Sequence, residues 1–423
     1  MLNINQLLRG VDCSCKKRHT CDIQYVYIEK NATEHLREIC RDDHTVLLVA
    51  DENTFGAAGE QTLAALQGKR IQTVIFSGAD ILVPNEEAIA AVTAQLENTD
   101  VIVGIGSGVI QDLCKYVSFY NRVPYVVVAT APSMDGYASS GAAMITDGMK
   151  VTYPAGLPRA IVADVAVLQN APMEMLKAGY GDIIGKFSAL NDWKLSHLVN
   201  DEYFCPYIYD LTYAQIERTL TLATGILQRE EESVKTLMEA LVVIGIMMSF
   251  AGNSRPASGS EHHLSHFFEI TGIVKNEPYF PHGIDVAYST VVTADIRERL
   301  LSRPFPATRY RLTRAEYSEK MQSIYRTVAD GCAELQEKVS NYAADRTSVY
   351  CAKEEEIKAV LAQVPTAKKI REMLSLVGLD MEEFYRLYGN EKIRDAVLYA
   401  KDLKDRYTVL WLNYDLWGGE QDV

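Results

Sequence analysis

Four of the chain's eight histidines lie within 21 positions: His262, His263, His266 and His282. His262 and His266 are four residues apart, which puts both side chains on one face of a helix, and His282 stands beside Gly283 on a turn that leads into another helix. Imidazoles from two helices, together with one carboxylate, hold a divalent ion and leave a coordination position open. The cluster therefore predicts a catalytic metal site, whereas a lone helical histidine is more often a surface or core residue.

Asp182 is the candidate for the carboxylate of this site. It follows Gly181 where the helical half of the chain begins. An acid at that place is also a natural helix N-cap, so the spacing alone leaves both roles open.

The second chemical feature is a glycine-rich turn between a predicted strand and a helix, with Gly104, Gly106, Ser107 and Gly108. Glycines let backbone N–H groups approach a pyrophosphate closely, and the N-terminus of the following helix favours negative charge. The spacing is Gly-x-Gly-x-Gly, which differs from the Gly-x-Gly-x-x-Gly of the standard dinucleotide fingerprint. A tight turn without a ligand is therefore the alternative to a dinucleotide site.

Asp51 ends another apolar run and has two possible roles. An acid at the carboxyl end of a strand can accept a hydrogen bond from a ribose hydroxyl of a dinucleotide. It can equally be the N-cap of the helix that follows.

Five short apolar runs in the first 165 residues predict strands of a mostly parallel sheet covered by helices. Each has four to six residues, is rich in Val and Ile, and is bounded by Gly, Pro, Asp or Asn, as expected for strands buried on both faces. The runs are Tyr25–Ile28, Thr45–Ala50, Ile71–Phe76, Val101–Ile105 and Tyr125–Ala129.

After about residue 168 the pattern becomes helical. The apolar positions Ile370, Met373, Leu374 and Val377 follow helical spacing, Gly378 stands where a C-cap belongs, and Asp380 with Glu383 resembles a capping box. We expect an α/β domain over residues 1–168 and an all-helical domain over residues 169–423.

Length and composition agree with this division. The 423 residues correspond to two or three domains at about 150 residues each, and 48% apolar and 23% charged residues are typical of a globular protein. A net charge of −14 opposes binding to nucleic acid. The longest uncharged apolar stretch, Ala240 to Ser254, has 15 residues, which favours a buried helix over a membrane span. With no recognisable leader segment, we expect a cytoplasmic protein with reduced cysteines.

A further cluster, Cys13, Cys15, His19 and Cys21, has ligand types suited to zinc. Its spacings are tighter than the usual Cys-x2-4-Cys pairs. We therefore favour a hairpin or arm that packs on the first domain, with a metal site as the alternative.

Together these segments resemble the superfamily of iron-containing alcohol dehydrogenases and dehydroquinate synthases, and within it the sn-glycerol-1-phosphate dehydrogenases. The resemblance covers nearly the whole chain and implies a Rossmann-like domain followed by a helical domain that binds metal and substrate. Asp182 counts against the synthase branch, which usually presents Glu there. The matching segments are Gly104 to Gly108 with Asp112 and Lys115, Thr130 to Ser139, Gly181 with Asp182, Ser254 to His266, Pro281 to Gly283, and Arg406 to Leu410.

The resemblance implies roles for individual residues. The metal ligands would be Asp182, His262 and His282, while His266 would lie near nicotinamide and substrate as a catalytic residue. Asp135 would line the substrate pocket, where it either takes part in proton transfer or binds a hydroxyl group. The residues expected to bind NAD(H) or NADP(H) are Asp51, Gly106, Ser107, Gly108, Asp112, Thr130, Ser133 and Ser139.

The implied reaction is reversible hydride transfer from reduced nicotinamide to dihydroxyacetone phosphate, which gives sn-glycerol 1-phosphate. Arg255 and Lys186 lie beside predicted ligands in the sequence and are our hypotheses for the phosphate-binding groups, although each can equally be an ordinary ion-pairing residue. The alternatives are a glycerol or polyol dehydrogenase, a 3-dehydroquinate synthase, or a member that binds nucleotide or metal without turnover.

Several properties remain open at this stage. A site of two histidines and one carboxylate accepts zinc, nickel, iron or cobalt, and zinc or nickel is our first expectation. Asp51 favours NADH, because a carboxylate repels a 2′-phosphate. We expect no nucleic-acid partner and no membrane span, and a homodimer or a higher homo-oligomer.

Overall fold

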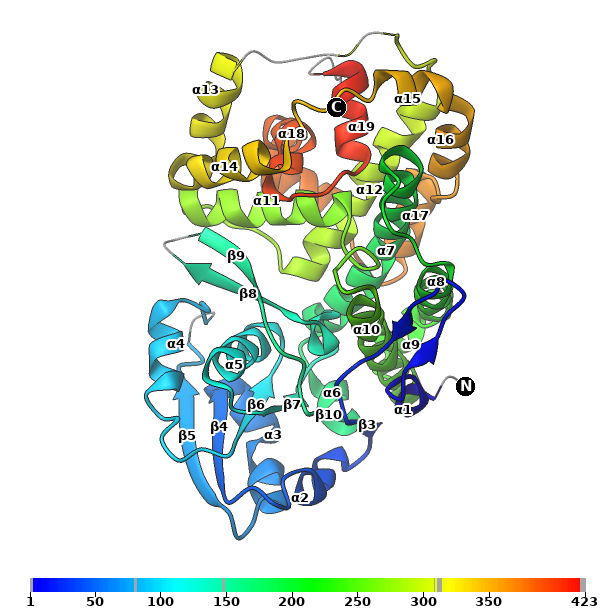
Figure 1. The fold of residues 1–423 in the computed structure, drawn as a ribbon. Helices are drawn as coiled ribbons and strands as arrows, with labels where there is room; N and C mark the ends of the chain where they lie inside the picture. The colour runs from blue at the N-terminus through cyan, green and yellow to red at the C-terminus, as the bar shows by residue number, and fades with distance from the viewer. Residues whose placement is uncertain (1–2, 80–81, 147–148, 308, 310–313, 419–423) are drawn as a thin grey trace. The chain divides into compact units, whose positions relative to one another are not determined.

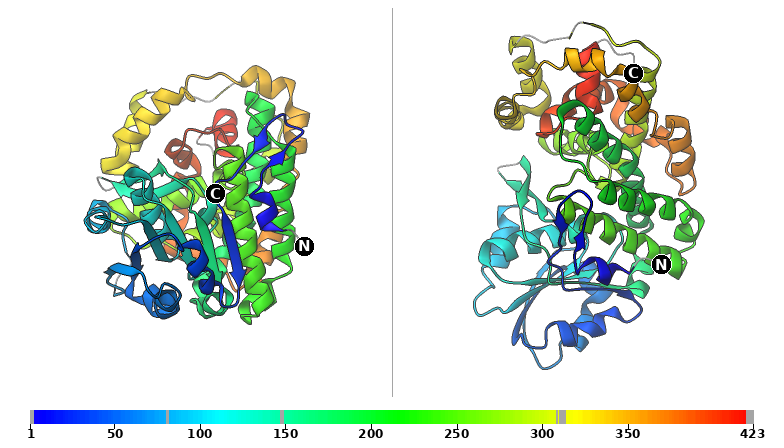
Figure 2. Two further views of the ribbon diagram at one scale, coloured as in Figure 1. Left: turned by 60° about the horizontal axis from the view of Figure 1, so that its bottom comes forward. Right: turned by 45° about the vertical axis from the view of Figure 1, so that its right-hand side comes forward.

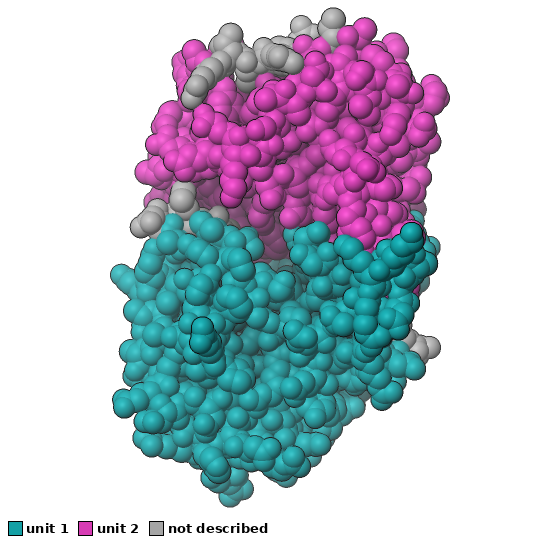
Figure 3. Space-filling model, viewed as in Figure 1, with its two compact units in different colours: residues 1–183, 210–254 teal, residues 184–209, 255–423 magenta. Residues whose placement is uncertain are grey.

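The computed structural model describes residues 3–79, 82–146, 149–307, 309 and 314–418. The chain forms two compact units, each made of two stretches of sequence (Figure 3). Unit 1 comprises residues 1–183 and 210–254, and unit 2 comprises residues 184–209 and 255–423. The division expected at residue 168 follows a different criterion, the change from strands to helices, and stays a prediction about domains.

Unit 1 is built on a six-stranded sheet whose neighbouring strands all run parallel, in the order β3-β10-β7-β6-β4-β5 (Figure 1). Each of the five predicted runs lies in one of its strands, which confirms the expected α/β architecture. The sixth strand, β10, was not predicted; two of its five residues are alanine, which favours strands less than Val and Ile do. The strands are β3 (Tyr25–Glu29), β4 (Thr45–Asp51), β5 (Arg70–Phe76), β6 (Val101–Gly106), β7 (Tyr125–Ala129) and β10 (Ala160–Asp164).

Helices cover both faces of this sheet, so the central strands are buried on both sides. Alternate residues of β4, β6, β7 and β10 form one apolar core with a 3₁₀ turn and helices α2 and α3, while α5 packs against the opposite face of β6 (Figure 2). This explains why the runs were apolar without alternation. The elements are η1 (Ala32–His35), α2 (Leu36–Ile39), α3 (Glu52–Ala65), α4 (Glu86–Thr93) and α5 (Gly108–Asn121).

Unit 1 also contains two antiparallel hairpins and a group of helices. The hairpins are β1 (Val11–Asp12) with β2 (Arg18–His19), and β8 (Gly141–Thr146) with β9 (Met149–Pro154). The remaining elements of this unit are α1 (Ile4–Leu7), η2 (Gly136–Ala138), α6 (Val165–Asn170), α9 (Ala223–Leu227) and α10 (Glu231–Ala251), together with parts of α7 (Met173–Asn200) and α8 (Pro206–Leu220).

Helix α10 contains most of the stretch predicted as a buried helix. It is long and apolar enough to cross a membrane, but 78% of its most apolar window is buried inside the protein. It packs on α6 and on the η2 turn of the same unit. Burial of this extent is typical of a core helix. Among the residues that the structure describes, α10 is the one helix that is long and apolar enough to be a candidate membrane span.

The described part of unit 2 is helical, as predicted. Leu374, on the buried face of α17, accepts backbone hydrogen bonds from Val377 and Leu379 around Gly378, whose φ of +69° is the left-handed conformation expected at a C-cap. The helices are α11 (Ser260–Lys275), α12 (His282–Leu301), α13 (Arg314–Tyr325), η3 (Arg326–Val328), α14 (Ala329–Val339), α15 (Thr347–Ala352), α16 (Glu354–Leu361), α17 (Ala367–Ser375), α18 (Met381–Tyr399), η4 (Ala400–Leu403) and α19 (Val409–Trp417).

The predicted capping box at the start of α18 is correct only in its first half. Asp380 is the N-cap, and its side chain accepts from the backbone N–H of Glu382. The carboxylate of Glu383 instead lies 3.4 Å from the hydroxyl of Tyr288, so the tertiary contact replaces the expected local bond.

Helix α7 runs from unit 1 into unit 2, and Gly179 sets how closely its first half approaches the loop after β7. A Cβ atom at Gly179 would overlap the backbone carbonyl of Pro132. Only a glycine fits there, because backbone atoms cannot move aside as the end of a flexible side chain can. Asp182 follows three residues later on the same helix, so this contact determines the position of its carboxylate.

We predict that Gly179→Ala lowers the free energy of unfolding by about 3 kcal/mol or more, because the added methyl group forces α7 away from the loop. The matched control is Gly56→Ala, in the exposed part of α3 where an added Cβ meets nothing within 4 Å. That variant should gain roughly 0.5–1 kcal/mol from the better helix propensity of alanine. Urea unfolding of both variants tests the contact, and equal stability of the two would contradict it.

Candidate active site

The order of the strands places a topological switch point at the carboxyl edge of the sheet in unit 1. The chain passes from β4 to β5 on one side and then returns to β6 on the other side of β4, so the connections diverge between β4 and β6 (Figure 1). Ligands of open α/β sheets bind in a crevice at such a point, which is where we expect one here. Asp51 ends β4 and Gly106 ends β6, so two of the predicted cofactor-binding positions flank this switch point.

The three glycines after β6 serve different purposes. A Cβ at Gly104 would lie 2.9 Å from the sulfur of Cys114, and one at Gly106 would lie 2.7 Å from Ile110, so both residues let α5 pack closely on its strand. A Cβ at Gly108 would meet only Met134, at an ordinary 3.7 Å. Packing within the protein therefore does not require glycine at position 108, whereas close approach of a pyrophosphate to the first turn of α5 would.

Asp51 is the N-cap of α3. Its Oδ1 accepts from the backbone N–H of Thr54 at 2.8 Å, and the hydroxyl of Thr54 accepts from the backbone N–H of Asp51 at 3.1 Å. The capping alternative is therefore confirmed. Capping occupies one carboxylate oxygen of Asp51, so it does not conflict with binding of a ribose hydroxyl. The ribose-binding role stays a prediction.

A fully buried lysine organises the segment after the glycine turn. The ammonium group of Lys115 bonds to Asp112 at 3.1 Å, to Ser139 at 3.3 Å, and to the carbonyls of Gly136 and Gly141 at 2.8 and 2.9 Å. A buried charge needs this degree of compensation. The structure therefore gives Asp112 and Ser139 an internal partner, and their predicted contacts with the cofactor are untested.

The loop after β7 links the carboxyl edge of the sheet to Asp182. The backbone N–H of Thr130 donates to the carbonyl of Gly106 at 3.3 Å, and the backbone N–H of Asp135 donates to Oδ2 of Asp182 at 2.9 Å. Ser133 lies between them and is buried. Asp182 is completely buried inside α7, so it is not the helix N-cap that its position suggested.

Three of the predicted histidines lie together in unit 2, where α11 packs against α12. The ring centres are 5.1 Å apart for His262 and His282, 5.4 Å for His266 and His282, and 6.1 Å for His262 and His266. His282 is the first residue of α12, so the expected second helix is confirmed. One ring nitrogen of His262 lies within 4.8 Å of one ring nitrogen of His282.

The two predicted histidine ligands are each held through Nδ1. His262 Nδ1 lies 2.7 Å from Oε1 of Glu261, and His282 Nδ1 lies 3.3 Å from the hydroxyl of Ser265. A metal-binding histidine is usually fixed in this way, with one ring nitrogen bonded to a carboxylate or hydroxyl group and the other presented to the ion. The same arrangement at Nδ1 of both residues agrees with their predicted role, in which Nε2 would be the atom that meets a metal ion.

Glu261 is completely buried, and burial raises the pKa of its carboxyl group despite the nearby charge of Lys186. Its Oε1 also accepts from the backbone N–H of Gly259 at 2.9 Å. Gly259 stands at the N-cap position of α11 and has no side chain to cap the helix. Glu261 thus supports both the start of the helix and the orientation of His262.

Asp192 of α7 supplies the cap that α11 lacks. Its carboxylate accepts from the backbone N–H of Ser260 at 2.7 Å and from that of Val409, at the start of α19, at 2.9 Å. The guanidinium group of Arg297 bonds to the same carboxylate at 2.8 Å, and both side chains are almost completely buried. One carboxylate of α7 therefore fixes the starts of two helices, including the one that carries His262 and His266.

Arg255, one of the two predicted phosphate-binding residues, already has a full set of partners. It bonds to both oxygens of Glu202 at 2.7 and 2.5 Å and to the carbonyl of Tyr407 at 2.8 Å, and it is 3% exposed. These bonds argue for a structural role. Lys186 is completely buried, and the phosphate-binding role of both residues stays a prediction.

His263 is the histidine to which no role was assigned, and its surroundings agree with that. Burial, with the positive charge of Arg406 next in importance, holds the pKa of its ring well below the usual range. The ring is therefore neutral and part of the core of unit 2.

Four residues that support the site were given no role from the sequence: Glu261, Ser265, Asp192 and Lys115. All but Asp192 lie in segments that match the family, and Glu261 directly precedes a predicted ligand. Asp192 and Ser265 act on residues far along the chain, so no spacing rule identifies their contacts.

Comparison with known proteins agrees with the resemblance that the motifs carry. The family model of the iron-containing alcohol dehydrogenases matches residues 27–172. The glycerol-1-phosphate dehydrogenase (NAD(P)+) of Halalkalibacterium halodurans is 35% identical over 289 residues, which are 66% of this chain and 72% of that enzyme. The corresponding enzyme of Geobacillus thermodenitrificans is 30% identical over 373 residues, 86% of each chain.

The chain belongs to the glycerol-1-phosphate dehydrogenase family. It is thus a member of an oxidoreductase family, as the sequence predicted. The iron-containing alcohol dehydrogenase of Thermococcus thioreducens has the same fold, with a TM-score of 0.60 over 93% of this chain and 98% of that one at 14% identity. This likeness confirms the expected fold of the family, an α/β region followed by a helical region.

Within this family member, we predict that Glu261→Gln weakens metal binding about 10–100-fold, because the neutral amide orients His262 less firmly and makes its ring less basic. Metal content should be measured after dialysis against increasing chelator concentrations. Glu372→Gln, on the exposed face of α17, is the matched control and should bind metal as the unmodified protein does. Unchanged affinity in Glu261→Gln would restrict Glu261 to a role in folding.

Proposed function

We propose that this protein reduces dihydroxyacetone phosphate to sn-glycerol 1-phosphate, reversibly, with NADH or NADPH as the hydride donor. Relatives that cover most of the chain are named as glycerol-1-phosphate dehydrogenases that use NAD(P)+. The observation that carries the proposal is the pair His262 and His282, each held at Nδ1 as metal-binding histidines are.

The metal would be held by Asp182, His262 and His282, a set of one carboxylate and two imidazoles that zinc, nickel, iron and cobalt all accept. When bound, such an ion supplies a Lewis acid for the carbonyl group of the substrate. Asp182 suits this role because the backbone N–H of Asp135 fixes the direction of its carboxylate. We keep zinc or nickel as the first expectation.

The nicotinamide cofactor would lie across the crevice between β4 and β6. Gly106, Ser107 and Gly108 would receive the pyrophosphate at the N-terminus of α5, where backbone N–H groups and the helix dipole favour negative charge. Asp51 would accept a hydrogen bond from the adenosine ribose, and Thr130 and Ser133 lie on the loop that begins at this edge. These local groups have to overcome the net charge of −14.

His266 and Asp135 are the groups proposed to move the proton that accompanies hydride transfer. The ring of His266 is 5.4 Å from that of His282, and Asp135 is bonded through its backbone to Asp182, so each lies next to a proposed ligand. One of them would deliver a proton to the carbonyl oxygen of the substrate as the alcohol forms. Asp135 can alternatively bind a hydroxyl group of the substrate.

A dehydrogenase for an unphosphorylated polyol is the second candidate, and one observation favours it. Arg255 is bonded to Glu202 and Tyr407, which leaves Lys186 as the remaining cation proposed for the phosphate. A triose without phosphate would not need either residue.

The test compares substrates after metal removal. The protein should lose activity on treatment with a chelator and regain it with one of the divalent ions, oxidising NADH or NADPH with dihydroxyacetone phosphate far faster than with dihydroxyacetone. Activity with dihydroxyacetone alone would move the assignment to the polyol dehydrogenases. Full activity without any metal would contradict the proposed site.

We predict that Asp51→Asn raises the ratio of kcat/KM for NADPH to that for NADH about tenfold, equivalent to 1.4 kcal/mol, because the carboxylate no longer repels a 2′-phosphate. Asparagine is as good an N-cap as aspartate, so α3 and the melting temperature should be unaffected. Steady-state kinetics with both cofactors measure the ratio. An unchanged ratio would place Asp51 away from the ribose.

A further inference from the structure

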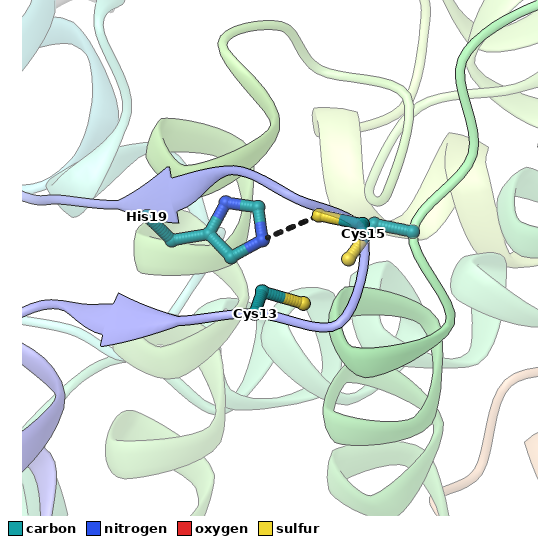
Figure 4. Close-up of side chains that lie close together, drawn as sticks. Cys13, Cys15 and His19 are labelled. Atoms are coloured by element: carbon teal, nitrogen blue, oxygen red, sulfur yellow. Dashed lines mark hydrogen bonds between the residues drawn. The ribbon is translucent and has the colours of Figure 1, made fainter.

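The residues Cys13, Cys15 and His19 converge on one point of a hairpin in unit 1 (Figure 4). Strand β1 pairs with β2, and the turn between them brings the ligand atoms of the three side chains within 4.8 Å of one another. The turn is closed by a hydrogen bond from Lys16 N–H to the Cys13 carbonyl at 3.0 Å, with Lys16 in the left-handed conformation. The predicted hairpin therefore exists, and its fold is what gathers these donors.

From this convergence we propose that Cys13, Cys15 and His19 bind a structural zinc ion, separate from the catalytic metal. Thiolate and imidazole are the ligands that zinc prefers in structural sites. Two ligands of a tetrahedral zinc ion, one sulfur and one nitrogen, lie about 3.6 Å apart when the usual bond lengths hold. Sγ of Cys15 lies 3.4 Å from Nε2 of His19, close to that separation.

His19 has the environment of a metal-binding histidine. It is 1% exposed, its Nδ1 lies 3.0 Å from the carbonyl oxygen of Phe250, and its ring stacks on that of Phe250 at 5.4 Å. A hydrogen bond from Nδ1–H to a carbonyl selects the tautomer whose Nε2 carries the lone pair. That nitrogen faces the thiols of the hairpin (Figure 4).

A thiol-to-histidine hydrogen bond alone would explain the contact of Cys15 with His19, but it would not require Cys13 at the same point. An ion that joins three hairpin residues would hold the hairpin on the end of α10 through His19.

The site has a built-in control in Cys21, which lies on the same segment. Cys21 is buried in the core, and its thiol is not among the ligand atoms that meet at the hairpin. Cys21→Ser therefore removes a nearby sulfur without touching the proposed ligands.

The test is metal analysis combined with cobalt substitution of the full-length protein. We expect zinc that is lost in Cys13→Ser and Cys15→Ser but kept in Cys21→Ser. The cobalt form should show thiolate-to-metal charge-transfer bands that vanish in Cys13→Ser and persist in His282→Ala, because the catalytic ligand set contains no sulfur. His19→Cys should retain zinc, since zinc accepts a third thiolate.

The cobalt spectrum of the unmodified protein is informative even if a variant fails to fold. Absence of thiolate bands there, or a disulfide between Cys13 and Cys15 found by thiol titration and mass analysis, would overturn the proposal. A thiolate site that is retained in Cys13→Ser would overturn it as well.

Removing the ion should also loosen the hairpin. Chelation is expected to speed tryptic cleavage after Lys16, Lys17 or Arg18, because the turn then opens more often. Cys21→Ser should show the same acceleration on chelation as the unmodified protein. Cleavage that is insensitive to chelator in both would argue against a pinning role.

Discussion

The buried carboxylate of Asp192 is the interaction on which the arrangement of unit 2 depends. A charge removed from water must be compensated, and here the compensation comes from Arg297 and from the unsatisfied N–H groups at the starts of α11 and α19. The helix that carries His262 and His266, α11, begins at Ser260, whose backbone N–H donates to this carboxylate. Gly259 permits the approach, because a Cβ there would lie 2.7 Å from the same carboxylate. The histidine cluster is thus positioned from α7.

In unit 1, close backbone packing fixes the position of the buried carboxylate of Asp182. Gly179 lets α7 meet the loop after β7, and that loop in turn holds the carboxylate through the N–H of Asp135. Helix α10 supports the loop from another side, where Ser249 donates to the carbonyl of Ala138 at 3.0 Å and Gly245 lets the backbone of Asp135 come close. The proposed zinc hairpin packs on the end of the same helix through His19. The loop after β7 and the hairpin of β1 and β2, which are remote in sequence, therefore both pack on α10.

Much of the fold was predictable because strands buried on both faces of a sheet consist of short, continuous apolar runs that are easily recognised in the sequence. The strands from β3 to β7 appear as short runs of Val and Ile, and family motifs mark the glycine turn and the histidines. The hairpin of β1 and β2 was expected as a hairpin or arm, whereas strand β10 and the hairpin of β8 and β9 were not predicted, since β8 and β10 are rich in alanine and glycine. Glu383 shows the limit of local rules, because its contact with Tyr288 replaces the capping bond that its spacing suggested.

The sequence by itself determined the class of fold and the family, because apolar runs and motifs are local properties, and the family resemblance implied Asp182, His262 and His282 as candidate ligands. Only the tertiary structure decided which side chains support those ligands: Glu261 and Ser265 on the histidines, the N–H of Asp135 on Asp182. It also changed the interpretation of two clusters. Arg255 proved to be bonded to Glu202, and the hairpin gathered Cys13, Cys15 and His19 at one point. The pair Arg255 and Glu202 joins residues that lie 53 positions apart, so no spacing rule predicts it, and in the hairpin only folding decides which of the neighbouring thiols meet.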